Sequence, residues 1–227
     1  MKLFKVFPLL FTFFFLSNFY ASAQTREKIT QAVEQRNYAL AVSELENLRK
    51  SDQKIFEINN YDYLLARMAE KKGDYAAAMA NYQSVAGRNS VLKEYALWHL
   101  SQIARSSGNL MLERSFLQEI STFALESLLI SAVKNRLAQS YFESKNYDTA
   151  IQLLNNFSAV GSQSKENSAV GSQPKSENAQ MRENLVLLAQ AYLQSGKTAQ
   201  ARETFAKLIT NLPNPAQPDD FALAGAK

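Results

Sequence analysis

The sequence contains no cysteine and only one histidine, His99. The lack of cysteine excludes disulfide bonds, thiolate zinc sites, iron–sulfur ligation and a cysteine nucleophile. A histidine-rich metal site is also excluded, and a Ser-His-Asp triad would have to be built on that single residue. No serine or carboxylate motif accompanies it. The sequence therefore predicts neither a catalytic site nor a bound cofactor or metal.

Glycine and proline are also scarce, with 7 and 5 residues in a chain of 227. No proline lies between Pro8 and Pro174, so we expect this stretch to form helices joined by short turns. Glycine-rich loops of the kinds that cradle phosphates are missing. The formal net charge is only +4, and no arginine-rich run is present. These features argue against a nucleic-acid partner.

The N-terminal residues have the organisation of an export signal. Two lysines precede an apolar run from Val6 to Leu16, and a more polar stretch then ends in small residues at 21–23. Signal peptidase cleaves this pattern, and we expect 1–23 to be a signal peptide cut after Ala23. The run is shorter than the ~20 apolar residues of a spanning helix, but an uncleaved membrane anchor is the alternative. The chain is expected in the periplasm or cell envelope of a bacterium.

Residues 24–213 carry an internal repeat. Each copy has a turn, an anchor residue and an apolar residue seven positions after the anchor, and four copies also have alanine three positions after it. The anchors are Tyr38, Tyr75, Leu110, Tyr147 and Thr198. The third copy departs from the pattern, because Glu113 stands where the alanine is expected. Small residues let two helices approach closely, so the pattern predicts helical hairpins, which must stack to bury their apolar faces.

These copies resemble the tetratricopeptide repeat, a helix–turn–helix unit of about 34 residues. The resemblance implies an all-α fold, a right-handed solenoid of about five helical hairpins. The first copy lacks the usual leucine in its leading helix and has Lys28 there. An unrelated array of α-hairpins is the alternative, and it differs little in what it predicts for function.

One segment interrupts the repeat. The sequence Ser-Ala-Val-Gly-Ser-Gln occurs at 158–163 and again at 168–173. It lies in a polar tract that offers little to bury, so we expect 158–178 to be a disordered insert. Residues 214–227 are expected to be a C-terminal tail whose proline and acidic residues have the character of a further helix start.

The helical period predicts which residues line the concave side of the stacked hairpins. The residue eight positions before each anchor should face the groove, and residues one helical turn away should join it. The candidate groove residues are Tyr63, Arg67, Trp98, Gln102, Arg105, Asn135, Arg136, Gln139 and Gln190, with His99 at the edge. Amides with scattered arginines and aromatics suit an extended peptide or a glycan. A solvated helix face without a ligand is the alternative.

A narrower resemblance rests on residues 63–75, 95–100 and 105–110. They look like the N-terminal helical solenoid of bacterial soluble lytic murein transglycosylases. In that family a separate lysozyme-like domain cleaves peptidoglycan with a catalytic glutamate, and nothing in residues 111–227 resembles it. The sequence thus predicts an exported, non-catalytic scaffold that binds a protein, a peptide or peptidoglycan. The alternative is the non-catalytic front part of a longer peptidoglycan-cleaving enzyme.

Overall fold

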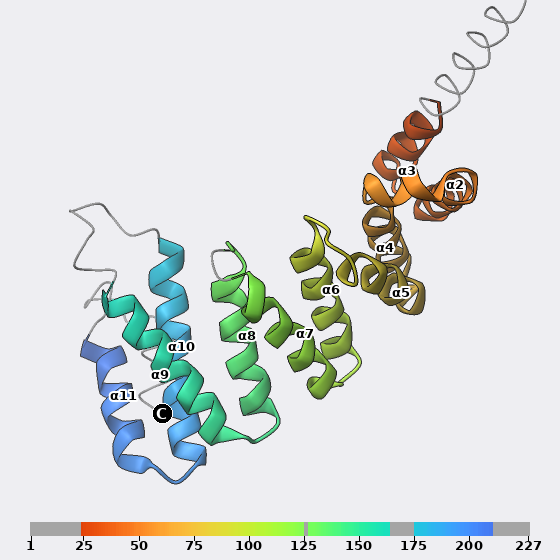
Figure 1. Ribbon diagram of the computed structural model, residues 1–227. Helices are drawn as coiled ribbons and strands as arrows, with labels where there is room; N and C mark the ends of the chain where they lie inside the picture. The colour runs from red at the N-terminus through yellow and green to blue at the C-terminus, as the bar shows by residue number, and fades with distance from the viewer. Residues whose placement is uncertain (1–23, 125–126, 164–174, 211–227) are drawn as a thin grey trace, which may run out of the picture. The chain divides into compact units, whose positions relative to one another are not determined.

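The computed structural model describes residues 24–124, 127–163 and 175–210, and it contains only helices in these parts of the chain (Figure 1). A helix of residues 24–34 comes first. It is followed by α2 (Tyr38–Ser51), α3 (Gln53–Ile58), α4 (Tyr61–Lys72), α5 (Tyr75–Ala86), α6 (Lys93–Ser106), α7 (Leu110–Phe123), α8 (Ile130–Glu143), α9 (Tyr147–Gln163), α10 (Lys175–Gln194) and α11 (Thr198–Thr210). The predicted all-α fold built from helical hairpins is confirmed. The predicted signal peptide, 1–23, and the tail, 214–227, lie outside the described residues.

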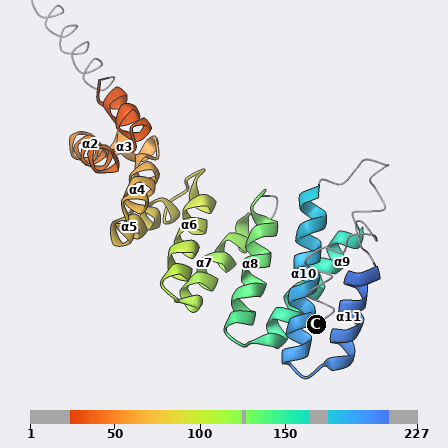
Figure 2. The same ribbon diagram turned by 180° about the vertical axis from the view of Figure 1, so that it is seen from behind.

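The chain divides into two compact units, Met1–Ile103 and Ala104–Lys227. In the first unit α2 packs against α3 and α4, and α4 packs against α5. In the second unit each helix from α7 to α10 packs against the helix that follows it, and α8 also contacts α10. Figure 2 shows α8 and α10 side by side. The leading helices of two successive hairpins therefore share one surface in the second unit.

All five hairpins turn through the same backbone geometry. The residue two positions before each anchor has a positive φ, between 56° and 85°. These residues are Arg36, Gly73, Gly108, Lys145 and Gly196. In each turn the next backbone N–H donates to the carbonyl oxygen five residues earlier, at 2.8–2.9 Å, which satisfies the end of the leading helix. Three of the seven glycines of the chain occupy this position, where a left-handed backbone favours them.

An asparagine or aspartate starts the second helix of four hairpins. Its side chain accepts a hydrogen bond from the backbone N–H three residues later, which caps the helix. The capping residues are Asn37, Asp74, Asn109 and Asn146. The fifth hairpin has Lys197 at this position. The turn, the cap and the anchor are therefore one local unit that the sequence repeats.

The alanines three residues after the anchors are buried in the packing of the helices. Ala41, Ala78 and Ala150 are 0% exposed, and Ala201 is 2% exposed. These positions are buried, as a close contact between two helices requires. In the third hairpin, Glu113 takes the same place and is also 0% exposed. A buried carboxylate there needs a partner, which the second unit supplies.

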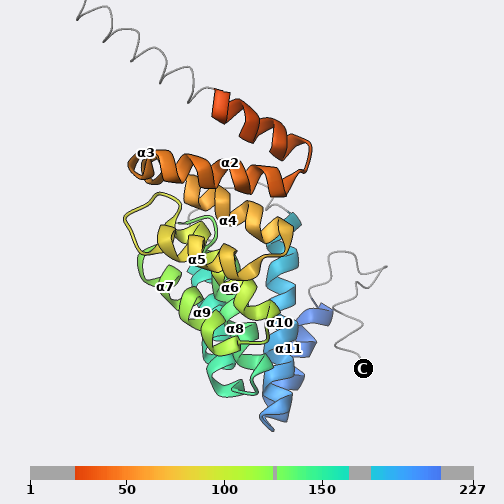
Figure 3. The same ribbon diagram turned by 90° about the vertical axis from the view of Figure 1, so that its right-hand side faces the viewer.

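The helix α3 was not predicted from the sequence. Figure 3 shows it following α2, and both helices pack against α4. The side chain of Asp52 caps it by accepting from the N–H of Ile55 at 2.9 Å. Phe56 is 1% exposed and belongs to the core of the first unit with Leu45 and Leu65. This six-residue helix gains its stability from that contact, because so short a helix is not stable alone.

The predicted insert, 158–178, is helical at both ends. Residues 158–163 continue α9, and 175–178 begin α10. Extending an existing helix adds one hydrogen bond for each residue that is fixed, so a sequence with few apolar residues can still prolong it. The middle of the predicted insert, 164–174, lies outside the described residues.

Candidate functional site: an amide-lined groove

A hollow of about 290 Å³ lies on the second unit between α8 and α10. Two of its lining residues come from α8 and six from α10, so both walls are leading helices of hairpins (Figure 1). We call this hollow the amide groove. Its lining residues are Asn135, Gln139, Gln180, Glu183, Asn184, Val186, Leu187 and Gln190.

Side-chain amides dominate the groove. The Nδ2 atom of Asn184 donates to Oδ1 of Asn135 at 2.9 Å, which links the two walls. Gln139 and Gln190 are exposed. Each amide offers both hydrogen-bond donors and an acceptor, so the surface can pair with a ligand that presents both kinds of group. Val186 and Leu187 add an apolar part to the lining.

Three of the residues predicted from the repeat meet in this groove. Asn135, Gln139 and Gln190 lie in it together, because positions spaced by whole helical turns share a face. The sequence reasoning missed the acidic and amide residues at 180, 183 and 184. The helical spacing could have identified Glu183, because it lies seven residues, about two helical turns, before the predicted groove residue Gln190.

The prediction that Arg136 faces the groove is wrong. Its side chain is 5% exposed and lies between two glutamates. Its Nε and Nη2 atoms donate to the carboxylate of Glu113 at 2.5 and 3.1 Å, and its Nη1 and Nη2 atoms donate to Glu143 at 2.9 and 2.7 Å. We call these three residues the buried triad. The arginine is the partner that the buried Glu113 requires.

Arg136 and Glu143 are held in their charged forms. Burial disfavours the charge of Arg136, but hydrogen bonds with Glu143 and Glu113 outweigh burial and raise its pKa. The hydrogen bonds from Arg136 lower the pKa of Glu143, with smaller contributions from the charge of Arg105 and a hydrogen bond from Gln139. Arg105, a predicted groove residue, is itself exposed near the end of α6 and does not line the amide groove.

In the first unit, three other residues named from the sequence, Tyr63, Arg67 and His99, join a half-buried polar and aromatic cluster. Nη1 of Arg67 lies 3.0 Å from Oε2 of Glu70 and 3.1 Å from both ring nitrogens of His99. The hydroxyl of Tyr82 donates to the same Glu70 oxygen at 2.6 Å, and its ring stacks on His99 with centroids 5.0 Å apart. Tyr63 meets both rings edge-on, at 5.6 and 6.1 Å. Glu70 is the hub of this cluster, because it contacts Arg67, Tyr82 and His99.

Burial controls the ionisation of the first-unit cluster. It raises the pKa of Tyr82, and the hydrogen bond to Glu70 raises it further. Burial lowers the pKa of His99, and the charge of Arg67 lowers it again, against an opposing effect of Glu70. The histidine ring is therefore neutral at pH 7. The remaining candidates, Trp98 and Gln102, are half-buried on α6.

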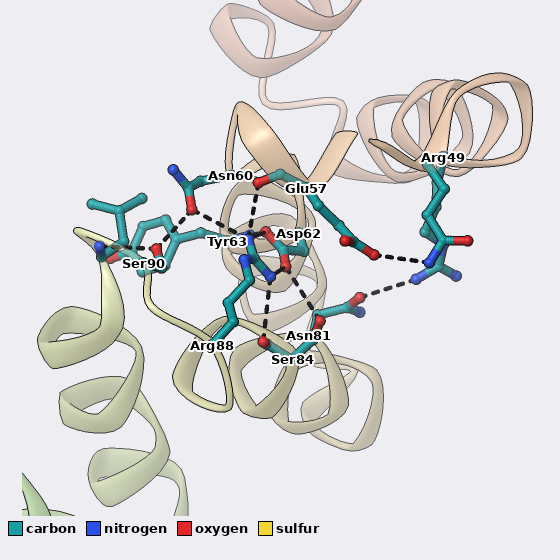
Figure 4. Close-up of polar contacts among 11 residues, drawn as sticks. Arg49, Glu57, Asn60, Asp62, Tyr63, Asn81, Ser84, Arg88 and Ser90 are labelled. Atoms are coloured by element: carbon teal, nitrogen blue, oxygen red, sulfur yellow. Dashed lines mark hydrogen bonds and ion pairs between the residues drawn. The ribbon is translucent and has the colours of Figure 1, made fainter. Parts of the chain in front are cut away.

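A second polar network in the first unit surrounds Asp62, which is 3% exposed (Figure 4). Nη2 of Arg88 donates to Oδ1 of Asp62 at 2.7 Å, to the backbone oxygen of Glu57 at 3.1 Å and to the side chain of Asn60 at 3.2 Å. Ser90 donates to the same Asn60 oxygen at 2.7 Å. These contacts join the turn between α3 and α4 to the segment after α5, so the network is structural.

The described parts of the chain contain no group of three or more His, Asp or Glu side chains suited to a metal ion. None of the helices within those parts is long and apolar enough to cross a membrane. The chemistry that the amide groove offers is hydrogen bonding to a ligand.

Models of the tetratricopeptide repeat family match residues 27–91, 136–159 and 183–215, together more than half of the chain. Among solved structures, a Podosopora anserina chain described as kinesin light chain nearly identical TPR-like repeats aligns with a TM-score of 0.57 and 16% identity, covering 82% of this chain and 92% of that chain. A variant of it gives 0.56 and 16%, with coverages of 82% and 91%. At this identity the similarity shows the fold alone. No curated protein matches the sequence.

Proposed function

Because the chain belongs to the tetratricopeptide repeat family, we propose that it is a non-catalytic scaffold that binds an extended segment of a partner protein in the amide groove. The observation that carries the proposal is the meeting of side-chain amides from two leading helices, α8 and α10, on one hollow. Repeat proteins of this kind bind along surfaces formed by successive repeats. The groove spans two of them.

The chemistry of the groove fits an extended backbone. Such a segment exposes an unpaired N–H and C=O at nearly every residue, and asparagine and glutamine amides can pair with both. On α10 the lining runs from Gln180 to Gln190, a distance of about 15 Å at 1.5 Å per residue. About four or five residues of extended peptide cover that distance. Val186 and Leu187 provide apolar contact for a side chain of the peptide.

We further propose that the scaffold acts outside the cytoplasm, in the cell envelope of a bacterium. The signal-like residues 1–23 support this location. The partner would then be an envelope protein. N-terminal sequencing of the protein recovered from a periplasmic fraction tests this part: we expect it to begin at Gln24, and recovery of the intact N-terminus in the membrane fraction would indicate an anchor instead.

Affinity capture from an envelope extract tests the binding function. The test variant is the double substitution Gln139→Ala with Gln190→Ala, which removes two exposed amides from the groove. Gln200→Ala on α11 is the matched control, because this glutamine is also exposed and lies outside the groove. We expect the double variant to bind the captured partner on the order of tenfold to a hundredfold more weakly. Equal capture by all three proteins would contradict binding in this groove.

Peptidoglycan is the ligand suggested by the resemblance to lytic transglycosylase solenoids, so it is tested in parallel. Sedimentation of the protein with purified peptidoglycan, without any other protein, distinguishes the two ligands. We expect no co-sedimentation above that of an inert control protein. Co-sedimentation that is lost in the Gln139/Gln190 double variant would replace the protein partner by the wall polymer.

A further inference from the structure

The charge of the amide groove is unusual for a surface in a chain with an excess of cations. All of the groove's lining residues lie in the parts of the chain that the structure describes. Glu183 is the one charged residue among them, and its side chain is exposed. Neither lysine nor arginine lines the hollow. Its carboxylate is oriented by Gln180, whose Nε2 donates to Oε2 of Glu183 at 3.1 Å. The groove thus presents a carboxylate among neutral amides.

The arginine next to the groove in the sequence is held by two carboxylates. Arg136 follows directly after the groove residue Asn135 on α8, but both of its hydrogen-bonding faces are taken by Glu113 and Glu143. Glu113 stands where the other four hairpins have alanine. An alanine there would leave Arg136 one carboxylate partner fewer. Glu113 therefore helps to hold Arg136 in the buried triad, and the arginine does not line the groove.

We propose that the amide groove selects peptide segments that carry a lysine or arginine side chain and disfavours acidic ones, with Glu183 as the residue that determines this preference. The inference rests on the proposed function, since it names the class of peptide for the same groove. A basic side chain gains an ion pair with Glu183, whereas an acidic side chain meets a like charge and finds no cation in the lining. The amides bind the backbone in either case.

Selection of random peptides on the purified full-length protein tests the preference. A phage-displayed library of random dodecapeptides is selected in parallel on the protein, on Glu183→Lys and on the control Glu203→Lys. The control makes the same change of charge on α11, at an exposed glutamate outside the groove. Both substituted side chains are exposed, and circular dichroism checks that the helical content is unchanged.

We expect lysine and arginine to be enriched in peptides selected on the protein and on Glu203→Lys, and aspartate and glutamate to be enriched on Glu183→Lys. A synthetic basic peptide from the selection should bind Glu183→Gln about two- to fivefold more weakly than the unchanged protein. Enriched peptides without basic bias, or with a bias that Glu183→Lys leaves in place, would overturn the preference but keep the peptide-binding function. Failure to enrich any peptide on any of the three proteins would overturn both.

Discussion

Replacing Arg136 by methionine should strongly destabilise the second unit. The arginine is 5% exposed, and the carboxylate of Glu113 beneath it is 0% exposed. Methionine keeps much of the apolar stem but removes the charge and all four hydrogen bonds of the buried triad. Glu143 is 32% exposed and can return to water, whereas Glu113 cannot. The variant leaves one buried carboxylate without its cation.

The expected cost follows from that unpaired charge. Breaking a buried ion pair by removing one partner typically costs about 3–5 kcal/mol, a large share of the ~5–15 kcal/mol that stabilises a domain. Urea denaturation followed by far-UV circular dichroism measures the loss, provided that the slopes of the transitions agree between variants. We expect the helical signal of the second unit to be lost at much lower urea in Arg136→Met.

A double variant separates the buried charge from a general loss of packing. Replacing Glu113 by leucine and Arg136 by methionine together removes both charges, and apolar replacements of buried pairs are often neutral or stabilising. The double variant should therefore be clearly more stable than Arg136→Met alone. If the single variant lost less than about 1 kcal/mol, or if the double variant were the less stable of the two, the reasoning from a buried charge would be refuted.

Three further predictions concern the turns, the hairpin contacts and the histidine. The pKa of His99 is lowered, first by burial and then by Arg67, so the folded state favours the neutral ring and loses stability as the pH falls through about 6.5. His99 is the only histidine of the chain, so His99→Gln should abolish this loss when thermal unfolding is compared at about pH 7.5 and about pH 5.5. An unchanged loss in the variant would contradict the assignment to His99. Ala150→Leu, at a site with 0% exposure, should cost about 1–3 kcal/mol in urea denaturation; the same replacement at exposed Gln152 should be nearly neutral, and equal costs would contradict the hairpin contact. Asn109→Ala, which removes the side-chain cap of α7, should cost about 1 kcal/mol, and no change would show that the turn does not need it.

The fold was predictable because its signals are local. The turn residue, the cap and the small residue after the anchor lie within six positions, and each has its own physical role. Their repetition identifies the hairpins even in the third copy, where Glu113 breaks the pattern. By contrast, α3 depends on a tertiary contact of Phe56, and the sequence of a six-residue segment does not reveal such a contact. The helical ends of the predicted insert were missed because the prediction used only the insert's polar composition. It did not consider that the adjoining helices could extend into the insert.

For the candidate site, the sequence predicts only which side of each helix the site residues occupy. Asn135, Gln139 and Gln190 line one hollow, and the helical period indicates such a shared face because each residue turns the helix by about 100°. It could not say whether a neighbouring helix carries an ion partner. That is why Arg136 was assigned to the groove when Glu113 binds it from α7. The cluster around Glu70 was not predictable for the same reason, since its partners come from three helices.

The buried triad makes Arg136 and Glu113 important for the stability of the second unit. Freeing Arg136 by substituting Glu113 would leave a cation with a single carboxylate, Glu143, and a vacated buried site beside it. Substitution of Glu113 therefore costs folding free energy. Substitution of Glu183 has no such cost, because this residue is exposed and bonds only within its own helix in the described parts of the chain. We therefore expect the charge preference of the groove to be altered readily at Glu183, while single substitutions in the triad reduce stability before they change specificity.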